Sequence, residues 1–516
     1  MDSFLIIKNF FDRMYSYERK TFKRFLLLNG SIEDNSRSIQ LFQLFEKYIG
    51  NEANQNLFIE KIYKKSDKNN SDSFRKLIER FRDKMYESHF LDINIYKEDF
   101  SSPFFLAIME VKKLVGLSYS IMSKGVPKSE AIRMLNRGIL LSKKYEFFDE
   151  LLIFLKLKLD FQGFYLGYAK QKLLFDEIVF AEKCKNDLFD SKKLFYFFIN
   201  DLQFKSTDEL KIREDIRNAC DRAKDIYIQN NLVNIFYDWH TLEIQYYHYC
   251  TDYVKAEIFL LKLLDFLKLN SELFQFRKIA DAFNNLSYTQ AFLYKFNDAL
   301  DSISKASEYS TSNINIKNFY KEHKAIINIY IQEYNIAINL IEEILNTGAS
   351  GNYPIQLSIR IYLLATAKFL AGDYKKSFKL LQETREIEND KEGWNIGIRM
   401  LQIFLTLETE KVDLADQRIE SLRKHIERTT KMKSVRKRDV VIFRLLNHLS
   451  RSGFDFQEVW EDRQKDFILL SSNDPDYRWI PRSHELILFE QWFEAKVNGV
   501  PYHPKFPQPI AEEKVD

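Results

Sequence analysis

The stretch Asn284–Glu308, with the sequence NNLSYTQAFLYKFNDALDSISKASE, decides the fold class of this chain. Its apolar residues are spaced for two helices, of which the first ends near Tyr294 and the second follows a turn at residues 295–298. Two packed helices approach most closely where small side chains meet, and Ser287 and Ala299 can fill that role. The stretch therefore predicts a helical hairpin.

The small residue of the second helix recurs along the second half of the chain. It stands at positions 256, 299, 337, 377 and 415, so the steps from one copy to the next are 43, 38, 40 and 38. An aromatic or apolar residue precedes it by three positions each time, and an apolar residue follows it by four. A period in this range indicates stacked helical hairpins. We therefore expect an all-α fold, an α-α superhelix built as a right-handed solenoid of about a dozen antiparallel hairpins.

These repeats resemble the tetratricopeptide repeat (TPR) family. In three copies, the residues at the signature positions are Leu286, Ser287, Phe296, Ala299, Ile303 and Ala306; Ala325, Tyr334, Ala337 and Ile341; and Ala365, Gly372, Tyr374, Ser377 and Leu381. The spacing exceeds that family's usual period of about 34, and the opening tryptophan and closing proline are absent, so the repeats are TPR-like. The resemblance covers about a third of the chain. It implies that polar and aromatic residues of the first helices face a concave groove that binds a protein or peptide segment.

Two short stretches, at residues 17–26 (YERKTFKRFL) and 489–496 (FEQWFEAK), resemble the two ends of a group of helical repeat proteins from Bacteroidetes-type bacteria. This resemblance implies one architecture along the full length and brings no activity with it. The 45 Phe and 28 Tyr residues agree with a bacterial genome rich in A and T.

We divide the chain into four regions by the quality of the repeats. Residues 1–100 are expected to form an N-terminal helical cap region, and residues 101–250 to form degenerate helical hairpins. Residues 251–425 carry the TPR-like repeats, and residues 426–516 form C-terminal capping helices and a proline-containing tail.

Outside the repeats, the helix boundaries follow from apolar spacing and polar breaks. Four of the expected helices are at residues 164–185, 191–204, 455–470 and 485–498. Trp460, Trp479 and Trp492 can anchor the C-terminal cap. The prolines at 504, 507 and 509 exclude regular helix, so the tail is either mobile or a strap along the surface.

The charges and cysteines restrict the setting of the protein. With 77 basic and 74 acidic residues and a net charge of +3, the chain has no general attraction to nucleic acid or to an anionic membrane. The three cysteines lie far apart, which fits a reducing cytoplasm better than a disulfide framework. The sequence contains no run of about 18 apolar residues, so it predicts no membrane span. We expect a cytoplasmic protein.

No sequence motif predicts catalysis or cofactor binding. His240 and Glu243 share a helix face, but His248 is two turns away and Cys250 lies off that face, so packing is favoured over a metal site. Acidic pairs such as Asp83 and Glu87 lack a positioned histidine, and no P-loop or dinucleotide fingerprint is present. We therefore expect no catalytic, cofactor-binding or metal-binding residues.

Two sets of residues are candidates for contact with a partner. The first derives from an aromatic run at residues 236–253 and from the first helix of the best repeat: Tyr246, Tyr247, Asn284, Asn285 and Tyr288. Such residues either anchor a partner or pack between helices. The second is a basic patch: Arg423, Lys424, Lys431, Lys433, Arg436, Lys437 and Arg438. A solvated helix end and loop is favoured here over contact with phosphate or an acidic partner.

The sequence therefore favours a non-enzymatic scaffold that binds a protein or peptide segment in the groove of a TPR-like solenoid. One alternative is a peptide-sensing regulator that controls a partner protein or DNA, although residues 4–28 show no convincing recognition helix. The other alternative is an enzyme, which would need a pocket that unites a histidine, a carboxylate and a nucleophile.

Overall fold

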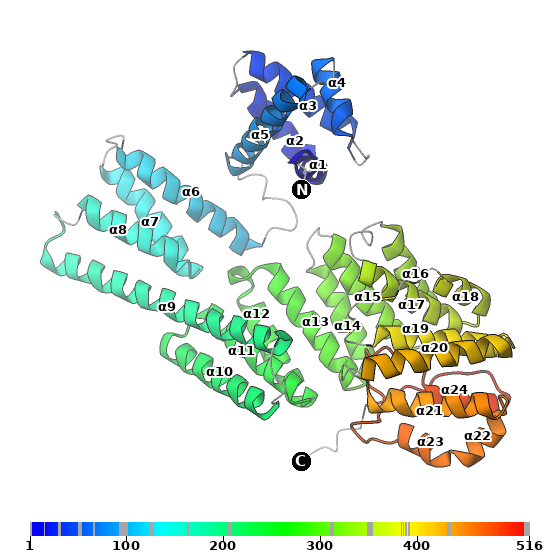
Figure 1. The fold of residues 1–516 in the computed structure, drawn as a ribbon. Helices are drawn as coiled ribbons and strands as arrows, with labels where there is room; N and C mark the ends of the chain where they lie inside the picture. Colours follow the sequence, from blue (N-terminus) through cyan, green and yellow to red (C-terminus); the bar gives the residue numbers. More distant parts are fainter. Residues whose placement is uncertain are drawn as a thin grey trace. The chain divides into compact units, whose positions relative to one another are not determined.

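The computed structural model describes residues 3–14, 16–28, 32–49, 54–64, 68–91, 102–123, 128–162, 165–204, 209–309, 314–347, 354–382, 384, 386–387, 390, 393–430 and 435–509. These ranges contain helices and no β-strand, which confirms the all-α class (Figure 1). None of these helices combines the length and apolar character needed to cross a bilayer. The chain divides into two compact units, Met1–Ala181 and Glu182–Asp516, which are described separately.

The first five helices pack around a core of phenylalanine rings. They are α1 (Ser3–Arg13), α2 (Ser16–Leu28), α3 (Ile32–Lys47), α4 (Gln55–Tyr63) and α5 (Lys68–Leu91). The fully buried rings are those of Phe4, Phe11, Phe22, Phe42, Phe45, Phe58, Phe74 and Phe81. Many of these rings meet edge to face, as Phe22 and Phe81 do at 5.0 Å. Aromatic side chains bury a large area each, so this core stabilises a short helical cluster.

Helices α7 (Lys128–Lys144) and α8 (Phe148–Gln162) form an antiparallel hairpin that the small-residue series did not reveal. They follow α6 (Pro103–Ser123). Gly138 makes the close approach possible, because a Cβ there would lie 2.5 Å from the Phe154 ring. This small residue is not at the position that the later repeats use, so the sequence pattern missed it.

Helix α9 corrects one expectation. Two helices were predicted, at residues 164–185 and 191–204, but the structure has a single helix, Tyr168–Phe204, of 37 residues. Residues 186–190 include neither glycine nor proline, so nothing in their sequence forces a break in the helix. The boundary between the two compact units falls inside this helix.

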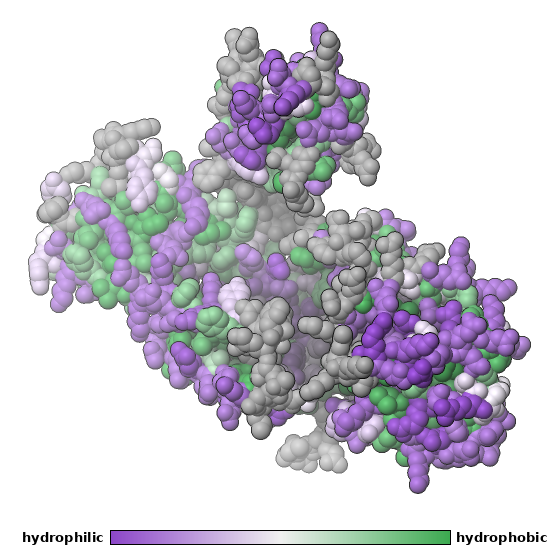
Figure 2. Space-filling model, in the orientation of Figure 1, coloured by the Kyte–Doolittle hydropathy of each residue, from purple (hydrophilic) through white to green (hydrophobic). Residues whose placement is uncertain are grey.

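Five hairpins form the larger part of the second unit, after α10 (Glu209–Asn230). In order they are α11 (Val233–Tyr249) with α12 (Tyr253–Leu269), α13 (Phe276–Phe292) with α14 (Phe296–Glu308), α15 (Ile314–Tyr330) with α16 (Tyr334–Asn346), α17 (Pro354–Leu370) with α18 (Tyr374–Gln382), and α19 (Trp394–Glu408) with α20 (Val412–Thr430). Each helix contacts the next, so the hairpins stack in sequence order (Figure 1). The right-handed sense of the stack stays a prediction. On the face drawn in Figure 2, hydrophilic residues dominate around α18 and α20.

All five hairpins use the same turn of three residues. The middle residue has a left-handed backbone, with φ between 55° and 81°, at Thr251, Tyr294, Gln332, Gly372 and Glu410. In each turn the third residue donates its N–H to the carbonyl five positions earlier, as Asp373 does to Lys368 at 2.9 Å. The middle residue donates to the carbonyl three positions earlier. These two bonds define the Schellman end of a helix, and they satisfy carbonyls that would otherwise lack partners.

Small residues occupy equivalent crossings in the three best repeats, as the sequence predicts. The paired positions are twelve residues apart and fully buried: Ser287 with Ala299, Ala325 with Ala337, and Ala365 with Ser377. The Ser287 hydroxyl donates to the Ala299 carbonyl at 2.6 Å, and the Ser377 hydroxyl donates to the Ala365 carbonyl at 2.7 Å. A serine on either helix therefore joins the two helices at the same point.

The last helices are α21 (Lys437–Arg451), α22 (Phe456–Asp462), α23 (Gln464–Leu470) and α24 (Phe489–Val497). The single helix expected at 455–470 is interrupted at Arg463, which lets Trp460 and Phe467 both face Phe493 of α24, at 6.3 and 4.9 Å. Residues 485–488, expected to begin the last helix, are not helical.

Residues 471–509, here called the C-terminal segment, lie against the first helices of the repeats and include α24. The backbone N–H of Arg482 donates to the Tyr330 hydroxyl at 2.6 Å, and the Gln332 side chain donates to the Pro504 carbonyl at 3.0 Å. Phe506 is buried, 5.1 Å from the Tyr330 ring. Of the two alternatives for the tail, the strap is correct as far as residue 509, and residues 510–516 lie outside the described ranges.

Candidate ligand and partner site

The C-terminal end of α11 presents two tyrosine rings beside two cations. Tyr246 and Tyr247 are half-buried and meet edge to face, with centroids 5.2 Å apart. The Arg217 guanidinium lies 5.2 Å from the Tyr246 ring, and the Lys255 ammonium lies 5.6 Å from the Tyr247 ring. A cation over an aromatic face is attracted to it. The structure thus places these two predicted residues on one aromatic and cationic surface, and their contact with a partner stays a prediction.

The three predicted residues of α13 have different neighbours. The Asn284 side-chain oxygen lies 3.1 Å from the His323 Nδ1 of α15. The Tyr288 ring lies 4.8 Å from the Arg482 guanidinium, so the C-terminal segment reaches it. Asn285 is half-buried. The structure therefore does not unite these residues with Tyr246 and Tyr247 in one cluster of contacts.

A cavity of about 360 Å³ lies where two hairpin turns meet the C-terminal segment. Residues 251–254 and 292–295 line it from the two turns, and residues 478–481 and Pro509 line it from the C-terminal segment. Cavities that hold small ligands usually measure about 300–1,000 Å³. The cavity is therefore large enough for one apolar side chain or a compact ligand.

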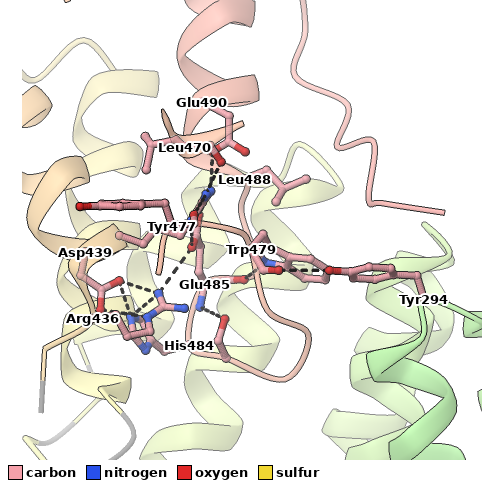
Figure 3. Close-up of polar contacts among 12 residues, drawn as sticks. Tyr294, Arg436, Asp439, Leu470, Tyr477, Trp479, His484, Glu485, Leu488 and Glu490 are labelled. Carbon is pink, nitrogen blue, oxygen red and sulfur yellow. Dashed lines mark hydrogen bonds and ion pairs between the residues drawn. The ribbon is translucent and has the colours of Figure 1, made fainter. Parts of the chain in front are cut away.

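Four of the 13 residues that line the cavity are aromatic. Tyr253 stacks on Phe292 at 4.5 Å, and Tyr294 stacks on Trp479 at 6.2 Å. The Tyr294 hydroxyl donates to the Trp479 carbonyl at 3.4 Å (Figure 3). Burial raises the pKa of Tyr253 to about 12, so this hydroxyl is neutral and can donate a hydrogen bond. Such a wall favours an apolar group with a few polar contacts.

The charged side chains around the cavity differ in how they are paired. Lys295 Nζ binds Glu257 at 2.8 Å, and Asp252 binds Lys255 at 2.9 Å. Asp252 also caps α12 by accepting the Lys255 backbone N–H at 3.1 Å. The half-buried Arg478 guanidinium has no hydrogen bond or ion pair with any residue that the structure describes. Within those residues, this cation at the cavity is therefore free to meet an anion.

Of the histidines near the site, His240 is buried and His248 is half-buried, and both are neutral. Burial lowers the pKa of His248 to about 4, and its Nε2 lies 2.7 Å from the Thr289 hydroxyl. Burial likewise lowers the pKa of His240 to about 4, and its ring stacks on Phe236 at 3.7 Å. Glu243, another residue that was weighed as a metal ligand, forms a two-pronged pair with Arg217 at 2.7 and 2.9 Å.

The predicted basic patch is not one exposed surface in the structure. Arg438 is buried, with its side chain only 1% exposed, and Arg436 is half-buried; both form ion pairs. Lys437, which lies between them, pairs with Asp476 at the surface. Arg438 and its neighbour Asp439 are both buried at this helix start whereas Lys437 is exposed, which a count of charges along the chain cannot show. The other members are divided as well: Arg423 pairs with Glu420 and Glu427, Lys424 lies 3.6 Å from Glu420, and Lys431 and Lys433 lie outside the described residues.

Arg438 connects three segments of the C-terminal region. Its guanidinium binds both oxygens of Glu485 at 2.7 and 2.8 Å, and it binds Glu490 at 2.5 Å. It also donates to the Leu470 and Tyr477 carbonyls at 2.6 and 2.8 Å. These bonds hold the C-terminal segment in place, including the part that lines the cavity.

A second part of this network joins Arg436, Asp439 and His484. Arg436 donates to both Asp439 oxygens at 3.0 and 2.5 Å, and His484 Nε2 lies 3.1 Å from Asp439 (Figure 3). Burial alone would raise the pKa of Asp439, but His484 and Arg436 hold this pKa well below its usual value. Burial raises the pKa of Glu490 to about 7.

Two glycines allow His484 to reach α19. A Cβ at Gly393, where φ is 82°, would lie 2.7 Å from the His484 ring. A Cβ at Gly397 would lie 2.6 Å from the His484 carbonyl, which accepts a hydrogen bond from the Tyr362 hydroxyl at 2.6 Å. Any larger residue at these positions would push the C-terminal segment away from the repeats.

Comparisons with known proteins give a fold likeness only. No family model and no curated protein matches this chain. Among solved structures, it is similar to the apo form of RapI, with 15% identity and a TM-score of 0.41, over 70% of this chain and 86% of that chain. It is also similar to a signal transduction ATPase with a tetratricopeptide repeat sensor from Pyrococcus horikoshii, with 11% identity and a TM-score of 0.40, over 84% of this chain and 67% of that chain. At these scores neither likeness bears on function.

The class of the protein follows from its own hairpins. Five successive hairpins share one turn, and three of them share the small crossing residues, so this is an all-α, TPR-like helical repeat protein. The sequence did not identify Arg478 or Phe292, although it singled out Tyr253 and Trp479 for other reasons. The segments that line the cavity come from distant parts of the chain, so no local pattern indicates it.

Proposed function

We propose that this protein is a non-enzymatic scaffold that binds a protein or peptide segment at the ends of α11 and α13. The observation that carries the proposal is the half-buried pair Tyr246 and Tyr247, with Arg217 and Lys255 over their rings. Tyrosine and arginine are enriched among the residues that contribute most to protein interfaces. They combine a large apolar area with a polar tip that remains hydrated before binding.

The surroundings of the tyrosine pair support a rigid binding surface. Tyr247 also lies 5.4 Å from Phe259 of α12, so both helices of the first hairpin position its ring. The Tyr247 carbonyl accepts the Asp252 N–H in the hairpin turn at 2.9 Å. A surface that is ordered before binding loses less conformational entropy when a partner arrives.

The chemistry of the neighbouring groups favours binding over catalysis. The neutral His248 lies against Thr289, and Glu243 is held by Arg217, so both have a packing role. Three cysteines without disulfide bonds suit a reducing compartment, and we propose that the protein works in the cytoplasm. The partner is a protein or peptide.

The proposal is tested by affinity capture from an extract of the cell that makes the protein. Captured proteins are compared among the wild type, the double variant Tyr246→Ala/Tyr247→Ala and the variant Asn285→Ala. Tyr119→Ala, a change at an exposed tyrosine of α6, serves as the matched control. We expect the double variant to lose a captured protein that the control retains, with affinity weaker by tenfold or more. An unchanged set of captured proteins in the double variant would show that this surface is not the binding site.

A further inference from the structure

The cavity between the two hairpin turns and the C-terminal segment combines an aromatic wall with an unpaired cation. The aromatic residues that line it are Tyr253, Phe292, Tyr294 and Trp479. Among the described residues, the guanidinium of Arg478 is the lining charge without a partner, because Lys295 and Asp252 are already paired. A partly desolvated guanidinium without an anion is costly, so a bound carboxylate would stabilise it.

The position of Arg478 relative to the rings suits an anion at this place. Burial raises the pKa of both Tyr253 and Tyr294, and the positive charge of Arg478 opposes the rise in each pKa. Arg478 lines the same cavity as both tyrosines. An anion that binds Arg478 can also accept a hydrogen bond from a neutral tyrosine hydroxyl.

We propose that this cavity binds the last residue of a peptide, with an apolar side chain against the rings and the terminal carboxylate on Arg478. The inference rests on the proposed function, since it specifies which part of a peptide partner enters the protein. The cavity volume of about 360 Å³ suits one large side chain with its carboxylate, and the planar guanidinium can bind both carboxylate oxygens.

A free carboxylic acid with an apolar group has the same chemistry as a peptide end. The peptide source is favoured because one of the turns that line the cavity, at residues 251–253, directly follows the end of α11 that carries Tyr246 and Tyr247, where the preceding residues of a peptide can bind. In that case the peptide should bind more tightly than a small acid, because the additional residues add contacts.

The test measures fluorescence anisotropy of labelled peptides with the full-length protein. The probes are Gly-Ser-Gly-Ser-X peptides in which X is Leu, Ile, Phe, Tyr or Trp, each with a free carboxylate and with a terminal amide. We expect at least one free carboxylate to bind, and its amide to bind more weakly by tenfold or more, because the amide lacks the charge that strengthens a hydrogen bond to a guanidinium.

Two variants locate the site. Arg478→Gln removes the cation and should weaken binding by tenfold or more, whereas Lys505→Gln removes an exposed cation of the same segment and should leave binding unchanged. Val254→Trp places a large ring at the exposed edge of the cavity and should also block binding. Thermal unfolding of each variant confirms that it is folded.

The inference would be overturned if no probe binds up to about 1 mM, a concentration that detects interactions of about −4 kcal/mol. Equal affinity of the acid and its amide would also overturn it. So would wild-type affinity in either Arg478→Gln or Val254→Trp. Equal affinity for 3-phenylpropanoate and for the best peptide would reassign the cavity to small acids and overturn the peptide source. The peptides could fail this test while Tyr246→Ala/Tyr247→Ala still loses a captured protein. In that case the cavity proposal is wrong and the proposed scaffold function stands.

Discussion

The Arg438 side chain holds together segments that lie far apart in the sequence. It binds two carboxylates and two backbone carbonyls while its own exposure is only 1%. Charge removed from water at this depth is stable only when every donor has an acceptor. Because its contacts come from α23, α24 and the loop between them, one side chain of α21 determines how the C-terminal segment is seated.

We expect Arg438→Met to lower the free energy of unfolding by about 3–5 kcal/mol, because it leaves Glu485 buried without its partner. The measurement is chemical denaturation followed by circular dichroism. Arg451→Met, at an exposed arginine of the same helix, is the control and should change stability by less than about 0.5 kcal/mol. Equal losses in the two variants would mean that the network does not stabilise this region.

At the scale of elements, the hairpin turns show most clearly how helix packing determines local structure. The same two hydrogen bonds, and a left-handed residue at the same position, recur in all five hairpins. The residue at that position is Thr, Tyr, Gln, Gly or Glu. Only glycine adopts this backbone without steric cost, and a β-branched residue such as Thr251 adopts it least readily. The turn is therefore imposed by the packing of the two helices, and the local sequence merely tolerates it.

Exchanging residues between two turns tests this view. Thr251→Gly should raise the free energy of unfolding by about 1 kcal/mol, because it relieves the strain at φ 56°. Gly372→Thr should lower it by a similar amount, at φ 81° with nothing within 4 Å of the new Cβ. Thermal and chemical unfolding measure both changes. Stabilisation by Gly372→Thr would contradict the strain argument.

The sequence predicts these elements well where the repeat is regular. Small residues at Ala299, Ala337 and Ser377 locate the crossings because two helices can approach closely only there. The small-residue pattern misses a crossing where the small residue stands at another position, as at Gly138 with Phe154. The sequence also fails to predict the break in the helix at Arg463. The long-range contact between Phe467 and Phe493 favours this break.

At the scale of the whole molecule, buried histidines couple the stability of the second unit to pH. Burial lowers the pKa of His240 and His248 to about 4, below the value of about 6.5 for an unfolded chain. Burial also lowers the pKa of His323 well below its usual value, with a contribution from Arg482. At acidic pH the unfolded chain therefore binds protons that the folded chain does not.

We expect the contribution of these histidines to the free energy of unfolding to be greatest above about pH 6.5 and to fall as the pH decreases towards 4, whereas Glu490, whose pKa is raised to about 7, contributes in the opposite direction. Between pH 7.5 and pH 5, His248 alone should account for a loss of about 2 kcal/mol. Denaturation at several pH values measures the slope, and His248→Gln should reduce it, whereas His503→Gln, at an exposed histidine, should not. A slope unchanged by His248→Gln would contradict the assignment.

The amino-acid sequence by itself determined that this protein is helical, that its second half is a series of TPR-like hairpins, and which small residues lie at the crossings. Those features depend on contacts between residues a dozen positions apart, so a local pattern records them. Only the tertiary structure decided that Arg438 is buried, that the C-terminal segment crosses the repeats, and that Tyr253 and Arg478 share a cavity. These contacts join residues far apart in the chain, and their geometry depends on how the hairpins stack and on the space that Gly393 and Gly397 leave for His484.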